Sequence, residues 1–152
     1  MESILVLHAR GAIHDLVGNL CEVSVAMGYS LRSLRGDPCS PAAKLPTIAK
    51  RICILKTVDV PVDHIPDDQV IGSVHIIRTS NLPPRCRISF HLEDLCGNAL
   101  PHVDQPSLQR FCAKSYMLLE ARSLLIEENE VKLGTGPFHL PNSQVDTGPL
   151  HA

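Results

Sequence analysis

The sequence predicts a mainly β fold with helices, of the α+β class, and two observations carry this prediction. Over residues 51–94 apolar and polar side chains alternate with a period of two, which is typical of half-buried strands. Over residues 108–126 apolar side chains recur at helical spacing, which predicts a long amphipathic helix. With 152 residues, 44% of them hydrophobic, the chain is long enough for one domain with a buried core.

The first 35 residues form a separate N-terminal segment in this prediction. Four apolar residues in it are spaced for one helical face: Ile13, Leu16, Val17 and Leu20. Over residues 23–34 the pattern suits a helix or a strand equally well, and both assignments stay open. Proline and glycine then interrupt regular structure, so we expect residues 36–47 to form a Pro-rich linker.

The predicted β core with its helix spans residues 48–133. Residues 51–60 form the first strand candidate, and residues 70–78 form the second, which carries Gly72 in its interior. A glycine inside a strand marks a bulge or a close approach of another part of the chain. Residues 81–84 predict a reversal, because their two prolines fix φ and remove backbone donors.

The strand at residues 85–92 has the cleanest alternation. Its even-numbered positions are apolar, and its odd-numbered positions hold Arg85, Arg87, Ser89 and His91. We therefore expect a half-buried strand with a basic outer face. Phe90 and Phe111 fall at apolar positions and are predicted to lie in the core. After residue 133 Gly, Pro, Asn and Ser dominate, so residues 134–152 are predicted to form a flexible tail.

Sequence motifs typical of enzymes are absent from the chain. It has no glycine-rich phosphate loop, no nucleophile elbow and no HExxH motif, so we expect no enzyme activity and no cofactor. The six cysteines include no CxxC pair, so no metal ligands are assigned. Cys53, Cys86 and Cys112 are instead predicted to be buried small hydrophobes. A zinc site assembled from scattered cysteines and histidines stays open as a third alternative.

Charge and hydropathy exclude further classes. The net charge is −2 with eight histidines counted as neutral, so no global field attracts nucleic acid or an acidic membrane. No apolar run approaches the roughly 18 residues of a membrane span. The acidic start, with only four consecutive aliphatic residues, is a poor signal peptide. These features predict an intracellular protein.

The stretch GSVHIIRTSNLPPRCRISFHLED, residues 72–94, resembles the central region of plant-virus movement proteins of the 30K superfamily, especially of the tobamovirus type. Members have a glycine that opens a hydrophobic strand, a polar reversal, a second strand and a closing aspartate. The matching residues here are Gly72 for the glycine, Asn81, Leu82 and Pro83 for the reversal, and Asp94 for the aspartate. Family members are usually much longer, and the charged tail of many members is replaced here by an almost uncharged segment.

The resemblance implies a fold and a function. The implied fold is an antiparallel, jelly-roll-like core with accessory helices. The implied function is cell-to-cell movement of a viral genome, in the host cytoplasm and at plasmodesmata. The implied partners are single-stranded nucleic acid, with RNA favoured, host plasmodesmal or membrane-associated proteins, and further copies of the chain in a homo-oligomer. A small viral or host interaction protein, such as a silencing suppressor or adaptor without nucleic-acid transport, is the alternative.

The predicted nucleic-acid-binding surface consists of six basic residues on and ahead of the hairpin: Lys50, Arg51, Lys56, Arg78, Arg85 and Arg87. Local positive charge can hold phosphates even when the whole chain is mildly acidic. A solvated basic face without a ligand is the alternative interpretation of the same residues. Asp94 is expected to cap a turn, because aspartate readily accepts hydrogen bonds from nearby backbone donors.

Overall fold

One antiparallel sheet forms the centre of the computed structural model, which describes residues 3–33, 48–59, 65–94, 97–100, 105–126 and 132–133. Within these residues the strands are β1 (Ser3–Arg10), β2 (Ser30–Ser33), β3 (Ala49–Leu55), β4 (Val70–Asn81), β5 (Pro84–His91) and β6 (Lys132–Leu133). Their order across the sheet is β2-β3-β4-β5-β1-β6, and each neighbouring pair is antiparallel. The predicted α+β class is therefore confirmed.

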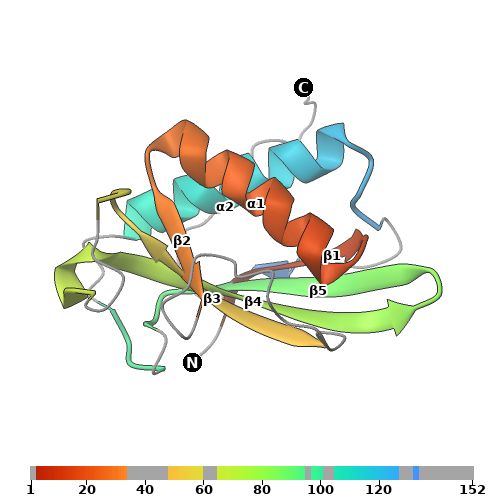
Figure 1. Ribbon diagram of the computed structural model, residues 1–152, viewed down its shortest axis with the longest axis horizontal. Coiled ribbons are helices and arrows are strands. Elements are labelled where there is room, and N and C mark those ends of the chain that lie inside the picture. Colours follow the sequence, from red (N-terminus) through yellow and green to blue (C-terminus); the bar gives the residue numbers. More distant parts are fainter. Residues whose placement is uncertain are drawn as a thin grey trace.

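Two helices of the described residues, α1 (Ile13–Met27) and α2 (Gln105–Ala121), lie side by side on one face of this sheet (Figure 1). The described chain thus has two layers, a sheet and a helical pair, with the core between them. A jelly roll instead packs two sheets face to face. The jelly-roll-like core that the resemblance implies is therefore not confirmed in the described part of the chain.

The N-terminal segment contributes a strand and a helix to the same sheet and core as residues 48–133. Strand β1 lies inside the sheet, between β5 and β6, and α1 packs against the sheet and against α2. A strand in that position cannot be removed without exposing both of its neighbours. The predicted linker 36–47 and the predicted tail 134–152 lie outside the described residues.

Helix α1 resolves the segment that the pattern left open between helix and strand. The four residues predicted to share a helical face are all buried: Ile13, Leu16, Val17 and Leu20. The helix continues to Met27 and ends because Gly28 adopts the left-handed conformation (φ 78°). The backbone N–H groups of Gly28 and Tyr29 donate to carbonyls of the last helical turn, and β2 begins directly afterwards.

The strands of the central hairpins match the predicted segments in place but not in length. Strand β3 ends at Leu55, so Val58 lies beyond it with 60% of its surface exposed, which corrects the predicted strand 51–60. Strand β4 runs on to Asn81, three residues past its predicted end. The predicted reversal is confirmed, because β4 and β5 are joined by a turn at Leu82 and Pro83.

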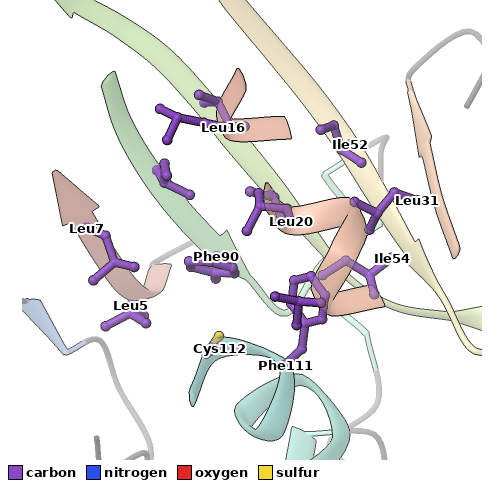
Figure 2. Close-up of a cluster of buried hydrophobic side chains, with 14 of the residues drawn as sticks. Leu5, Leu7, Leu16, Leu20, Leu31, Ile52, Ile54, Phe90, Phe111 and Cys112 are labelled. Atoms are coloured by element: carbon purple, nitrogen blue, oxygen red, sulfur yellow. The ribbon is translucent and has the colours of Figure 1, made fainter. Parts of the chain in front are cut away.

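Aliphatic side chains fill the space between the sheet and the helices. Figure 2 shows Leu5 and Leu7 of β1, and Ile52 and Ile54 of β3, lying in one cluster with side chains of both helices. Phe90 and Phe111 meet edge to face, with 6.1 Å between ring centroids, so both are core residues as predicted. The prediction is also confirmed for three thiols, which are free and buried: Cys53, Cys86 and Cys112.

Gly72 allows helix α2 to lie close to β4, because it has no side chain at the contact. A Cβ atom at this position would stand 2.8 Å from Cδ1 of Leu108 and 2.9 Å from the carbonyl oxygen of His91. The predicted close approach is therefore confirmed. The helix ends at Ala121 instead of near Ile126, because Ser123 takes a positive φ and the chain turns. Residues 124–126 then run beside β1, where the N–H of Ile126 donates to His8.

Candidate nucleic-acid interface

The face of the sheet turned away from the helices carries the alternate residues of each strand. In β5 Cys86, Ile88 and Phe90 enter the core, so the residues between them point to the opposite side. We call this side the outer face. By strand register it includes Val6, His8, Arg10, Arg51, Cys53, Ser73, His75, Ile77, Arg85, Arg87, Ser89 and His91.

Three arginines gather on the outer face near the end of the β4–β5 hairpin. Arg10 of β1 stands directly opposite Arg85 of β5, and Arg87 stands opposite His8. We call Arg10, Arg85 and Arg87 the arginine patch. Arg10 and Arg87 are exposed, and Arg85 is half-buried. Burial and the charge of Arg87 lower the pKa of His8, so this ring is neutral at about pH 7.

Like charges oppose one another in the arginine patch. Side chains directly opposite across two antiparallel strands have Cβ atoms about 5 Å apart, and like charges there destabilise the pair. Arg10 is partly anchored, because its guanidinium donates to the carbonyl oxygens of Ser123 and Leu125 at 3.4 and 3.3 Å. The fold therefore holds positive charge in place on a surface that water and anions can reach.

The structure separates the six basic residues that the sequence groups together. Arg51, Arg85 and Arg87 lie on the outer face, with Arg51 opposite His75. Lys50 and Arg78 pair with core residues of the neighbouring strands, so they lie on the helical side of the sheet, which corrects their assignment to the same surface. Alternation causes this split, since consecutive strand residues point to opposite faces.

Lys56 is also distant from the arginine patch, because it follows β3 at the opposite end of the sheet. Two residues of the interface were missed by sequence reasoning, namely His8 and Arg10. Their signal was present in the alternation of β1, where Leu5, Leu7 and Ala9 are buried. That alternation predicts an outer face for Arg10, but it does not say which strand lies beside it.

The residues that carry the family resemblance have structural roles here. Gly72 lets α2 approach, and Leu82 stands at the hairpin tip with 89% of its surface exposed. Asp94 caps a turn as expected: its Oδ1 accepts from the backbone N–H of Asn98 at 2.9 Å, and its Oδ2 accepts from the Asn98 amide at 3.2 Å. These residues shape the hairpin and its exit and do not belong to the arginine patch.

A second polar group lies farther along the outer face, and no sequence motif pointed to it. His75, His91 and Glu93 form what we call the histidine cluster. The two imidazole rings have centroids 4.1 Å apart, and His75 Nε2 lies 3.5 Å from Glu93 Oε2. Strand register brings them together, since β4 and β5 pair Ser73 with His91 and His75 with Ser89.

Both histidines of the cluster are neutral at about pH 7. Burial is the largest cause that lowers the pKa of His91 to about 4, and the neighbouring His75 and Arg51 contribute to the same shift. Burial and the charge of Arg51 also lower the pKa of His75, against the opposing effect of Glu93. Neutral imidazoles carry an unprotonated ring nitrogen, which is a hydrogen-bond acceptor or a metal ligand.

No protein-family model, curated protein or solved structure matches the chain. Within the described residues, neither helix is long and apolar enough to cross a membrane.

Proposed function

We propose that the protein binds single-stranded nucleic acid, with RNA favoured, and that the arginine patch holds its phosphates. The observation that carries this proposal is the opposed pair Arg10 and Arg85, extended along β5 by Arg87. A phosphate bound between the two guanidinium groups would remove their mutual repulsion and accept charge-assisted hydrogen bonds from both.

In the proposed complex, contacts to phosphates supply the affinity, and contacts to bases contribute little. The described residues of the outer face include no Phe or Tyr, because Phe90 and Phe111 point into the core. Bases therefore lack the aromatic platforms on which single strands usually stack. We expect weak sequence preference and an affinity that falls steeply as salt rises, because contacts to phosphate carry no direct sequence information.

We extend this proposal to a movement-type role, in which the protein accompanies a viral genome between cells through plasmodesmata. This part rests on the resemblance of residues 72–94. The resemblance also implies host plasmodesmal or membrane-associated proteins as partners, and cooperative assembly of several copies on one nucleic-acid strand.

Filter binding of a labelled single-stranded RNA to the full chain tests the binding proposal. The double variant Arg85→Glu/Arg87→Glu should lose at least about tenfold in affinity, because two phosphate contacts are replaced by repulsion. The matched control is Arg110→Glu/Lys114→Glu, which makes the same charge change at two exposed positions of α2. The control should bind within about twofold of the wild type, and circular dichroism should confirm that both variants are folded.

Equal binding by the Arg85→Glu/Arg87→Glu variant and the wild type would overturn the proposal and leave the interaction-protein alternative. Equal loss in the control variant would also overturn it, because net charge and not the outer face would then govern binding. Unlabelled double-stranded RNA in excess is a further arm, and it should compete less well than the single strand. For the movement role, a fluorescent fusion in single leaf epidermal cells should form wall-associated puncta and spread to neighbours, whereas a confined diffuse signal contradicts it.

A further inference from the structure

We propose that His75, His91 and Glu93 form a zinc-binding site on the outer face of the sheet. Each residue offers one ligand atom, and these atoms all lie within 4.8 Å of one another. His91 and Glu93 are buried, and His75 is half-buried. The inference goes beyond nucleic-acid binding and does not depend on it, since the arginine patch is a separate set of residues.

The separation of the ligand atoms suits a tetrahedral zinc ion. Zinc binds imidazole nitrogen and carboxylate oxygen at about 2.0–2.2 Å, so two ligand atoms of a tetrahedral site stand about 3.4 Å apart. His75 Nε2 and Glu93 Oε2 are 3.5 Å apart, which matches that separation. The third atom, on His91, lies within 4.8 Å of the other two, and two of the ligands stand on paired strands.

Several buried polar atoms without a hydrogen-bond partner lie at the proposed zinc site. His75 Nε2 and His91 Nδ1 are both buried without a hydrogen-bond partner in the described part of the chain. The hydroxyl oxygen of Ser73, directly opposite His91, is a third such atom. Buried polar groups in folded proteins are nearly always paired, so an orphaned group calls for an explanation such as an ion. A metal bound by the two imidazoles would satisfy both ring nitrogens.

Ser89 determines which nitrogen of His91 is available. The Ser89 hydroxyl lies 3.4 Å from the carbonyl oxygen of His75, to which it donates. Its oxygen is then free to accept from Nε2–H of His91, 2.9 Å away. This arrangement puts the proton on Nε2 and leaves a lone pair on Nδ1, which is buried without a hydrogen-bond partner in the described part of the chain. Such a partner behind a ligating histidine is the usual device for orienting a metal ligand.

The donor set selects the class of metal. Two imidazoles and one carboxylate are typical ligands of Zn²⁺, whereas Mg²⁺ and Ca²⁺ prefer oxygen ligands alone. The positive charge of Arg51 acts on both histidines and opposes a cation, and the carboxylate of Glu93 offsets it. The chain supplies three ligands, which leaves a fourth position for a solvent molecule.

Isothermal titration of the full, metal-free chain with zinc chloride tests this proposal. We expect uptake of zinc at one site, and a loss of at least about 100-fold in affinity in Glu93→Gln and in His75→Ala. The matched control is His14→Ala, which removes an exposed histidine on α1 and should leave the affinity unchanged. Arg85→Glu/Arg87→Glu should also keep the zinc affinity, which separates this site from the arginine patch.

Cysteines elsewhere in the chain are the main competing ligands, so Co²⁺ is used as a second probe. A site made of nitrogen and oxygen gives visible Co²⁺ absorption without the near-ultraviolet band of thiolate ligation. Zinc uptake below about 0.1 equivalent would overturn the proposal. Unchanged affinity in both ligand variants, or a thiolate band in the Co²⁺ complex, would overturn it equally. Because His75 is half-buried, its alanine variant keeps the test valid if Glu93→Gln fails to fold.

Discussion

At the scale of single residues, Gly72 decides how closely the helical layer approaches the sheet. Its missing side chain leaves room for Leu108 on one side and for the backbone of His91 on the other. The leucine side chain can move, but the carbonyl oxygen of His91 is held by strand pairing. Any larger residue at this position must therefore push α2 or β5 away.

Gly72→Ala is predicted to destabilise the protein by about 1–3 kcal/mol, the usual cost of overpacking a filled core. Urea unfolding followed by circular dichroism measures the change. Gly18→Ala is the matched control, because a Cβ at that exposed position of α1 meets nothing within 4 Å. The control should be neutral or stabilising, since alanine is the better helix former. Equal stability of Gly72→Ala and the wild type would contradict the close approach.

The buried thiols are predicted to be chemically inert in the native protein. Burial raises the pKa of Cys53 to about 12 and raises that of Cys112 well above its ordinary value. The thiolate is the reactive form, so neither residue should be alkylated by iodoacetamide at about pH 8. Peptide mass spectrometry after labelling in buffer and in urea measures this, and only the urea sample should be modified. Modification in buffer at the urea rate would show that the core opens readily.

At the scale of elements, the two helices are joined by an ion pair on their exposed sides. Arg122, in the turn after α2, donates two hydrogen bonds to the Glu22 carboxylate at 2.7 and 3.0 Å, and a third to Asn19. Paired geometry of this kind orients the helices, although solvent and salt screen such exposed pairs. The hydrogen bonds from Arg122 lower the pKa of Glu22.

Glu22→Gln is predicted to lower the melting temperature slightly at about pH 7 and to have no effect in acid. A carboxylate with a depressed pKa in the folded state stabilises above its unfolded pKa, and this stability is lost as pH falls through the folded value. Thermal unfolding of both proteins between about pH 7 and pH 3 measures the difference. Asp59→Asn, at an exposed position outside the helices, is the control. A difference that persists in acid would rule out the ion pair as its cause.

At the scale of the whole molecule, the net charge is only −2, but three arginines gather on the outer face of the sheet. The arginine patch and Arg51 share one face of the sheet, while the exposed pair of Glu22 and Arg122 belongs to the helical layer. A polyanion therefore meets a locally basic surface on a mildly acidic protein. Electrostatic steering from a distance is weak in such a molecule, and binding depends on local contacts.

Salt dependence of RNA binding follows from this distribution. Single strands lose about 0.7 unit of log affinity per unit of log salt for each phosphate neutralised. The three arginines of the patch would give a slope of about −2, and Arg85→Glu/Arg87→Glu should reduce its magnitude by at least about 1.4. Filter binding over a range of sodium chloride concentrations measures both slopes. A slope near zero in the wild type would exclude phosphate-led binding.

Local pattern was enough to predict several parts of the molecule. The helical face of α1, the reversal at Leu82 and Pro83, and the burial of Cys86 each depend on a few consecutive residues. Periodicity in such a window reports directly on which side of an element is buried. The predicted lengths of β3 and α2 were wrong. The ends of these elements are set by a turn and by packing against residues distant in the sequence.

The sequence by itself determined the class of the fold, the aliphatic core and the basic side of β5, because each depends only on local periodicity and composition. Tertiary structure alone decided that β1 lies beside β5, which sets Arg10 against Arg85, and that His75 and His91 meet. It also turned Lys50 and Arg78 away from the outer face. Pairing between strands distant in the chain depends on how both helices bury their apolar sides together, and no local pattern carries that information.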